Sequence, residues 1–162
     1  MSIERVKAYL DRYGMAGRVL EFSVSSATVE LAALALHTQE ARIAKTLSLQ
    51  GADGPILLVA AGDARIDNAK FKLTFGLKAR MLAHEQVAEI IGHAVGGVCP
   101  FAIENPSVKV YLDESLKRFH TVYPACGTSS SAVEMTMDEL FLTSQSAGWV
   151  DVCKGWNEEE IA

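Results

Sequence analysis

The chain has 162 residues, of which 49% are hydrophobic and 22% are charged. This length predicts one domain, residues 1–162, because chains of about 150 residues bury roughly 70% of their extended surface. The net charge of −5 argues against a protein that coats DNA or RNA through counterion release, although it is compatible with a local basic patch that holds one RNA end.

Two further classes are disfavoured by the pattern of apolar residues and cysteines. No apolar run reaches the roughly 18 residues of a membrane span, and the N-terminus lacks a basic region followed by an apolar one. The cysteines Cys99, Cys126 and Cys153 are odd in number, widely spaced and without a CxxC pair. We therefore expect reduced thiols, a cytoplasmic protein and no membrane partner.

The first half of the chain predicts two helices and three strands. A helix with one apolar face covers residues 3–13 and stops at Gly14, and a short strand follows at 19–22. A second helix begins near Thr28, and its many apolar positions predict that it is well buried. Residues 41–49 and 55–61 read as strands joined by a turn at 51–54.

The second half alternates short helices and strands. Residues 67–76 fit either element, but the possible cap Asp67 and the stop Gly76 favour a helix. A helix at 84–91 leads into a glycine-rich loop at 92–106, and strands are predicted at 108–112, 121–124 and 132–135. Thr136 and Glu139 form a capping box that opens a helix through about 146, before a last strand at 149–152. The lack of a βαβ rhythm predicts an α+β fold, with a twisted or barrel-like sheet and helices outside.

Lys45 is the most informative single residue. Alternation along residues 41–49 places it on the same side of its strand as Ile43, Leu47 and Leu49, and a lysine is seldom buried without a partner. One interpretation is a cation that lines a cleft and meets an anion. The other is a side chain whose stem packs while its ammonium reaches water. The pattern leaves both open.

Two loops carry residues that suit a binding site. Glycines 92, 96 and 97 allow close approach of a ligand to the backbone, and successive amides there can bind an oxyanion or a phosphate. The segment 123–131 is rich in hydroxyl groups that can hold polar substrate atoms. Taken alone, each loop favours a plain structural interpretation, as a tight turn or a solvated hairpin loop.

The remaining chemistry is less well supported. The four histidines are scattered, so we expect no metal and no other cofactor. A thiol nucleophile at Cys99 or Cys126, with His93 as base, stays as an alternative, whereas the Gly-x-Ser-x-Gly elbow of serine hydrolases is absent. Basic residues cluster at 65–80 and at Lys117 and Arg118, where they either touch phosphates or form an ordinary solvated surface.

Three segments together resemble a known family. The strand at Lys45-Thr46-Leu47, the segment 62–67, and the glycine-rich loop with its Gly96-x-x-x-Pro100 motif are similar in order and type to the YbaK-like aminoacyl-tRNA deacylases. Related domains are inserted in bacterial prolyl-tRNA synthetases. The resemblance covers nearly the whole chain.

The resemblance implies a barrel-like mixed sheet surrounded by helices. It also implies hydrolysis of the ester of a mischarged aminoacyl-tRNA of the proline class, without metal, cofactor or covalent intermediate. The implied partners are the 3′ end of the tRNA and a prolyl-tRNA synthetase. In this family the lysine matching Lys45 holds the RNA end, loop backbone lies at the reacting carbonyl, and water attacks with help from the substrate's ribose hydroxyl.

Carried over by position, the resemblance assigns two groups of site residues. The catalytic group is Lys45, Gly96, Gly97 and Pro100. The substrate-binding group is Thr28, His93, Val98, Cys99, Gly127, Ser129 and Ser130. An aminoacyl ester is already activated, so positioning and an oxyanion site can suffice without a triad.

The chain departs from the best-known branch of the family in the amino-acid pocket. The Gly-x-x-Gly-(Leu)-Asp pattern of that branch is replaced by residues 127–132, without the acidic residue, and an aromatic before the lysine strand is replaced near Thr28. The hydroxyl-rich replacement suggests a small polar amino acid such as serine or threonine. A non-catalytic module that binds a synthetase or an aminoacyl-RNA end, and a thiol-dependent hydrolase of small esters, are the alternative functions.

Overall fold

The computed structural model describes residues 2–23 and 28–156. Its α-helices within these ranges are α1 (Ser2–Asp11), α2 (Val29–Leu36), α3 (Asn68–Phe75), α4 (His84–Ile91) and α5 (Met137–Thr143). Short 3-10 turns cover Ala16–Arg18, Glu40–Arg42 and Glu114–Arg118. The strands are β1 (Leu20–Glu21), β2 (Ile43–Gly51), β3 (Gly54–Ala61), β4 (Arg65–Ile66), β5 (Lys109–Asp113), β6 (Thr121–Pro124), β7 (Ser131–Ala132), β8 (Met135–Thr136), β9 (Gly148–Val150) and β10 (Cys153–Lys154).

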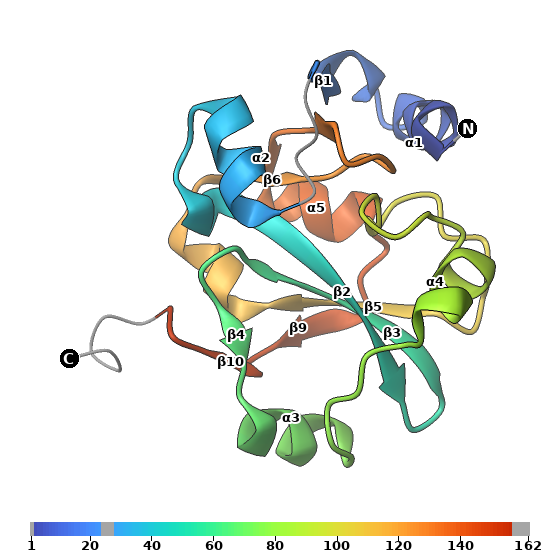
Figure 1. The fold of residues 1–162 in the computed structure, drawn as a ribbon, viewed down its shortest axis with the longest axis vertical. Coiled ribbons are helices and arrows are strands. Elements are labelled where there is room, and N and C mark those ends of the chain that lie inside the picture. The colour runs from blue at the N-terminus through green and yellow to red at the C-terminus, as the bar shows by residue number, and fades with distance from the viewer. Residues whose placement is uncertain (1, 24–27, 157–162) are drawn as a thin grey trace.

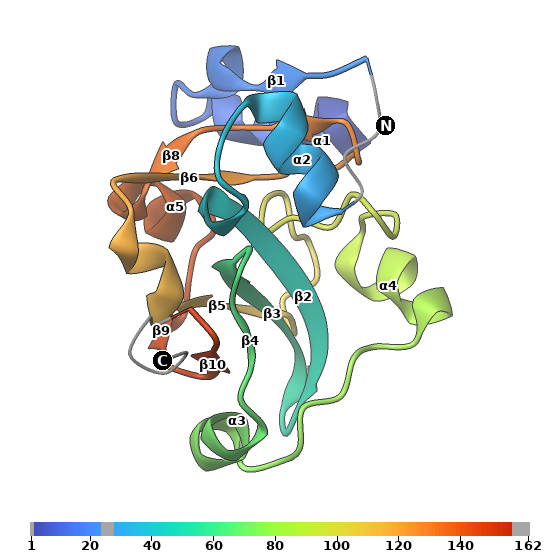
Figure 2. The same ribbon diagram turned by 60° about the vertical axis from the view of Figure 1, so that its left-hand side comes forward.

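The main sheet has the strand order β8-β6-β2-β3-β5-β9 and is mixed. The hairpin β2–β3 is antiparallel, whereas β6 joins β2, and β5 joins β3, in parallel. The sheet curls into a half barrel with helices outside it, and α1 and α3 lie at opposite ends of the molecule (Figures 1 and 2). The predicted α+β fold with a barrel-like sheet is therefore confirmed.

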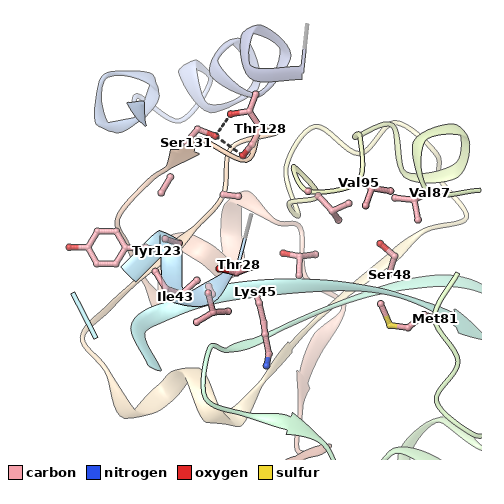
Figure 3. Close-up of a pocket in the computed structure, with 18 of the residues that line it drawn as sticks. Thr28, Ile43, Lys45, Ser48, Met81, Val87, Val95, Tyr123, Thr128 and Ser131 are labelled. Carbon is pink, nitrogen blue, oxygen red and sulfur yellow. Dashed lines mark hydrogen bonds between the residues drawn. The ribbon is translucent and has the colours of Figure 1, made fainter. Parts of the chain in front are cut away.

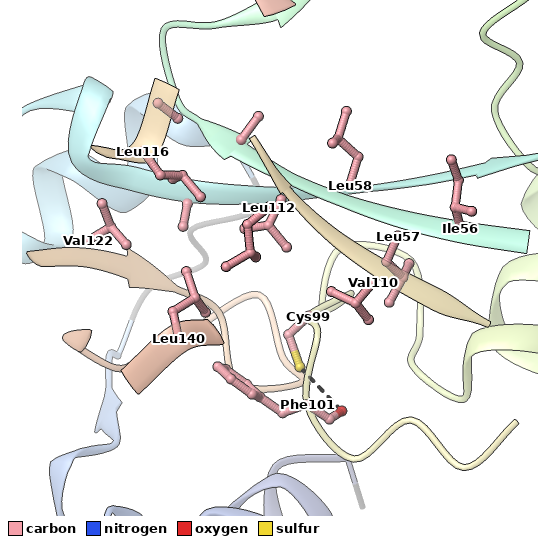
Figure 4. Packing of buried hydrophobic residues seen from close by; sticks show 14 of the residues in the cluster. Ile56, Leu57, Leu58, Cys99, Phe101, Val110, Leu112, Leu116, Val122 and Leu140 are labelled. Carbon is pink, nitrogen blue, oxygen red and sulfur yellow. Dashed lines mark hydrogen bonds between the residues drawn. The ribbon is translucent and has the colours of Figure 1, made fainter. Parts of the chain in front are cut away.

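The core lies between the sheet and the segments that cover its concave side. β3 is buried from Ile56 to Ala61, since neighbouring strands flank it on both sides. Leu57, Val110 and Leu112 pack toward Phe101 and Leu140, from the glycine-rich loop and α5 (Figure 4). The loop after α4 is thus held in place by core residues at its far end.

Several local signals act as the sequence predicts. The Asp67 side chain accepts hydrogen bonds from the amides of Ala69 and Lys70, so the ambiguous segment is the helix α3. Gly76 and Gly92 end α3 and α4 in the left-handed conformation, and Thr136 and Glu139 form their reciprocal capping box.

Three predictions about elements are wrong. α2 is not well buried, because Leu31 and Leu34 are 45% and 72% exposed and only one side of the helix faces the sheet. The strand predicted at 132–135 is split into β7, which pairs with β1, and β8, which pairs with β6. The strand predicted at 149–152 ends at Val150 as β9. A further strand, β10, follows it and pairs with β4, and local periodicity does not reveal this pairing.

Candidate active site

A cavity of about 400 Å³ opens between α2, β2, the glycine-rich loop and the loop after β6 (Figure 3). Its described lining is mostly apolar, with a few hydroxyl groups, and contains no Asp or Glu side chain. The lining residues are Thr28, Val29, Ala32, Leu36, Ile43, Ala44, Lys45, Thr46, Ser48, Met81, Leu82, His84, Val87, Val95, Gly96, Val98, Tyr123, Ala125, Thr128, Ser131 and Ala132.

One wall of the cavity is the inner side of α2. Val29, Ala32 and Leu36 recur at helical spacing and face the cavity. Thr28 starts this wall, because its side chain accepts a hydrogen bond from the amide of Leu31 and so caps the helix. The apolar side of α2, from which the sequence predicted burial in the core, therefore also borders a cavity.

Lys45 lies at the edge of this cavity, and its ammonium is held by backbone. Its Nζ donates hydrogen bonds to the carbonyl oxygen of Gly62, at 3.4 Å, and to that of Ala64. In Figure 3 the side chain runs to the side of β2 away from Thr128 and Val95. Burial lowers the pKa of Lys45 from its ordinary value, while Cys153 and Asp63 act in the opposite direction. The half-buried stem agrees with the second sequence interpretation, but the ammonium bonds to backbone carbonyls, a partner that neither interpretation named.

The carbonyl that holds Lys45 is itself fixed by a tight contact. A Cβ at Gly62 would lie 2.0 Å from the carbonyl oxygen of Glu40 and 2.7 Å from Cγ1 of Val29 on α2. Only glycine leaves room for this approach. Gly62 therefore couples the position of the Lys45 ammonium to the position of the α2 wall.

The floor of the cavity carries hydroxyl groups on β2 that the sequence interpretation did not assign. Thr46 and Ser48 alternate with Lys45 along the strand and both line the cavity. Thr46 Oγ1 is buried without a hydrogen-bond partner in the described residues. Ser48 is 4% exposed and projects toward Val87 (Figure 3). The sequence did contain a signal for these hydroxyls, because Thr46 and Ser48 are two positions apart and therefore share one side of the strand.

The two glycines of the Gly96-x-x-x-Pro100 motif have different structural roles. Gly96 lines the cavity with φ +94°, a conformation that favours glycine. Gly97 is buried, and a Cβ there would lie 2.4 Å from the carbonyl oxygen of Gly127 and 2.9 Å from the Cα of Thr128. The glycine-rich loop therefore packs backbone to backbone against the hydroxyl-rich loop, and this contact closes one end of the cavity.

The hydroxyl-rich loop is an internally bonded turn. Ser131 Oγ accepts from the amide of Cys126 at 3.2 Å and from Thr128 Oγ1 at 2.9 Å, and donates to the carbonyl oxygen of Thr128 at 3.2 Å (Figure 3). Ser131 is only 2% exposed. Its hydroxyl is thus committed to the loop, although the residue borders the cavity.

Comparison with known proteins identifies the family. The family profile described as "Aminoacyl-tRNA editing domain" matches residues 24–141. The chain belongs to this family. The editing domain is also 52% identical over 157 residues to the "Uncharacterized protein YwhH" of Bacillus subtilis, covering 96% of this chain and 99% of that protein.

Two other relatives connect the editing domain with prolyl-tRNA synthetase. Proline--tRNA ligase of Halalkalibacterium halodurans is 31% identical over 105 residues, which is 64% of this chain and 18% of the ligase. A crystal structure described as "a putative trans-editing enzyme for prolyl tRNA synthetase" has a TM-score of 0.85 at 31% identity, covering 95% of this chain and 98% of that one.

The editing domain brings some of the expected site residues together and leaves others outside the cavity. Thr28, Lys45, Gly96 and Val98 line it. The other expected site residues are not among its described lining residues: His93, Gly97, Cys99, Pro100, Gly127, Ser129 and Ser130. Gly97 and Gly127 instead form the contact between the two loops, so their places affect the cavity without touching it.

His93 and Cys99 meet, but in the interior. His93 Nε2 lies 2.7 Å from the carbonyl oxygen of Phe101 and 3.5 Å from Cys99 Sγ. A carbonyl only accepts, so Nε2 carries the proton and is no base for the thiol. Burial lowers the pKa of His93 and raises the pKa of Cys99 to about 12. These groups lack the exposed, low-pKa environment of a reactive cysteine.

We predict that Cys99→Ser and Cys126→Ser leave any ester hydrolysis by this protein largely intact. Both thiols are fully buried, and burial also raises the pKa of Cys126. The native protein should resist iodoacetamide at pH 8, as judged by mass spectrometry, until it is unfolded. Rapid alkylation that abolishes turnover would instead favour the thiol-dependent hydrolase.

The described residues contain neither a metal-binding cluster nor a membrane-spanning helix. In the described part of the chain, no three His, Cys, Asp or Glu side chains are grouped as a metal site would require. None of the described helices is long and apolar enough to cross a membrane.

Proposed function

We propose that this protein is a trans-editing hydrolase. It cleaves the ester between a wrongly attached amino acid and the terminal adenosine of a tRNA of the proline class, in the cytoplasm, and releases both products. Membership of the aminoacyl-tRNA editing family supports this proposal, as does the 31% identity to a proline–tRNA ligase. Prolyl-tRNA synthetase is the proposed partner that supplies the mischarged tRNA.

The observation that carries the proposal is the composition of the cavity. It combines apolar walls, hydroxyls on β2, a glycine with positive φ and one lysine at the rim, and its described lining has no carboxylate. A volume of about 400 Å³ lies at the low end of the 300–1,000 Å³ typical of small-molecule sites. Such a space suits a small aminoacyl group with part of its nucleoside.

The proposed mechanism assigns positioning, not proton transfer, to the protein. Lys45 provides a fixed positive charge for the RNA end, since Gly62 and Ala64 hold its ammonium by two of its three N–H groups. The amide of Gly96, which makes no hydrogen bond among the described residues, is available to the developing oxyanion.

In the bond-breaking step, water adds to the ester carbonyl and the bond to the ribose oxygen breaks. The proton from water passes to the ribose, whose neighbouring hydroxyl takes the place of a protein base. The absence of a carboxylate from the described lining is consistent with such substrate assistance. Because the ester is already activated, holding it in a reactive geometry accounts for much of the acceleration.

The amino acid that this site removes is proposed to be serine or threonine. The loop hydroxyls that suggest this choice are partly committed, since Ser131 is bonded within its own loop. The stronger support is Thr46, whose buried Oγ1 has no partner among the described residues, with Ser48 two positions along β2. A substrate hydroxyl that bonds to these groups gains an interaction that alanine cannot make.

A panel of mischarged tRNAs tests both the function and the selectivity. We expect release of serine or threonine from tRNA of the proline class, unaffected by EDTA. Thr46→Val keeps the side-chain shape and removes the hydroxyl, so it should lower the preference for Ser-tRNA over Ala-tRNA about tenfold, within the roughly 1–3 kcal/mol of an unsatisfied hydrogen bond. An unchanged preference for Ser-tRNA over Ala-tRNA would show that the Thr46 hydroxyl does not contribute to selectivity.

The second candidate function is a non-catalytic module that binds an aminoacyl-RNA end or a synthetase. The observation that favours it is the missing acidic residue in 127–132, a segment that forms part of the cavity. Saturable binding of Ser-tRNA or Ala-tRNA without release of the amino acid from any tRNA of the panel would support this candidate over the hydrolase.

A further inference from the structure

A basic segment of the chain is not explained by the cavity. Residues 68–84 contain four Lys or Arg residues and no Asp or Glu, in a protein with a net charge of −5. The sequence alone leaves two interpretations of this cluster, a phosphate contact or a solvated surface. The structure shows which of these cations already have partners and which are open to a phosphate.

Three cations of this segment are exposed and in no ion pair within the described residues. Lys70 is engaged, because its Nζ lies 3.2 Å from an Asp151 carboxylate oxygen. Lys72, Lys78 and Arg80 are all exposed, and we call these three residues the basic strip. The other basic pair in the sequence is neutralised instead: Lys117 pairs with Glu114 at 2.7 Å, and Arg118 pairs with Asp63 at 2.5 Å.

The strip leads to the rim of the cavity on a well-anchored backbone. Leu77 and Ala79 pack against the core while Lys78 and Arg80 are exposed, so these two cations lie on one side of an extended segment. The amide of Gln50 donates to the carbonyl oxygen of Arg80, at 2.9 Å. Two residues further on, the amide of Leu82 donates to the carbonyl oxygen of the cavity residue Ser48, also at 2.9 Å.

Lys72 extends the strip in the other direction, onto α3. It lies in the last turn of that helix, and its carbonyl oxygen accepts the hydrogen bond from Gly76 that ends it. Asp67 and Glu85 are the nearest acidic residues in the sequence on either side. The positive surface is therefore bounded, and it connects α3 with the Met81, Leu82 and His84 side of the cavity.

We infer that the basic strip binds the sugar-phosphate backbone of the RNA whose 3′ end enters the cavity. This inference rests on the proposed function, because it places the RNA by its reacting end. A cation without a partner at the surface costs little to pair with phosphate, and each such contact releases a counterion. Phosphate contacts of this kind fix position and orientation but carry no base specificity.

The experiment compares RNA binding by two charge-matched triple variants. Lys72→Gln/Lys78→Gln/Arg80→Gln removes the strip, and Lys7→Gln/Arg12→Gln/Arg18→Gln removes three cations on and after α1, at the opposite end of the molecule (Figure 1). The probe is uncharged tRNA of the proline class, titrated at several salt concentrations. Uncharged RNA is used so that binding is measured without turnover.

The strip variant should bind at least about tenfold more weakly at low salt, and the slope of log K against log salt should fall by about 2–3. The α1 variant should change both quantities much less. A third variant keeps the charge of the strip and should bind RNA as the unmodified protein does: Lys72→Arg/Lys78→Arg/Arg80→Lys. Equal losses in the two triple variants, or an unchanged salt slope in the strip variant, would overturn the inference.

Kinetics provide an independent readout that a damaged fold would not reproduce. With full mischarged tRNA, the strip variant should show a raised KM and an unchanged kcat, as expected when uniform binding is lost. Hydrolysis of an aminoacylated CCA trinucleotide, which lacks the duplex, should be unaffected. A lower rate on this short substrate as well would contradict the inference.

Failure of the strip and failure of the proposed function give different results. If no member of the panel is hydrolysed but the strip variant still loses RNA binding, the strip stands and the hydrolase does not. If the strip variant binds RNA normally but no longer binds prolyl-tRNA synthetase, the surface takes a protein partner and the inference is wrong.

Discussion

Lys45→Met is expected to lower kcat/KM for a mischarged tRNA by about 100-fold, the size of loss that misplacing a substrate by about 1 Å can produce. Methionine retains an unbranched apolar stem along β2 and removes the charge. The carbonyls of Gly62 and Ala64 hold the ammonium of this cavity-lining residue in one place, so loss of the charge removes the contact that the proposed mechanism assigns to the RNA end. Single-turnover deacylation with saturating and limiting enzyme would separate binding from chemistry.

Lys45→Arg is the matched control for charge. A guanidinium keeps the positive charge but presents a planar fork that does not reproduce the ammonium's bonds to two carbonyls, so we expect partial activity. The free energy of unfolding of Lys45→Met should fall by about 1–3 kcal/mol, because two hydrogen bonds from a charged group are lost and relief of the ammonium's partial burial offsets part of that loss. A Lys45→Met protein that is folded and fully active would overturn the proposed mechanism.

Gly97→Ala is expected to damage both stability and activity, because the added methyl group has no space. Its Cβ would lie 2.4 Å from the oxygen and 2.7 Å from the carbon of the Gly127 carbonyl, which are backbone atoms. Overpacking of this kind costs roughly 1–3 kcal/mol. Denaturant unfolding should show this loss, and deacylation should fall because the two loops that shape one end of the cavity are pushed apart.

Gly17→Ala tests whether this effect is specific to the loop contact. A Cβ at Gly17 has no atom within 4 Å, and the residue lies in an exposed 3-10 turn outside the described cavity lining. We expect neutral or slightly raised stability and full activity, since alanine reduces the entropy of the unfolded chain. Equal stability and equal deacylation activity of the two variants would show that the contact between Gly97 and Gly127 does not maintain the shape of the cavity.

Local signals in the sequence predicted elements well where one residue decides the outcome. Asp67 and Gly76 correctly favoured a helix at α3 over a strand, since the cap supplies two hydrogen bonds that an alternating pattern cannot. The capping box of α5 was equally reliable. The error over α2 has a clear origin: a helix that is apolar nearly all round is predicted to be buried, but here part of that face borders a cavity.

By itself, the sequence determined the order of the α-helices and of the longer strands, the α+β class and the three segments that mark the editing family. These depend on caps, periodicity and short motifs, which are local properties of the chain. It also singled out Lys45 and Gly96, which line the same cavity.

Only the tertiary structure decided what these residues touch. The carbonyls that hold Lys45 lie 17 and 19 positions along the chain, and the backbone that excludes a side chain at Gly97 lies about 30 positions away. The partners of Lys70, Lys117 and Arg118 likewise appeared only in the fold, and within residues 68–84 they leave the basic strip without ion pairs among the described residues. Contacts between distant segments depend on how the sheet curls, and no local pattern encodes that geometry.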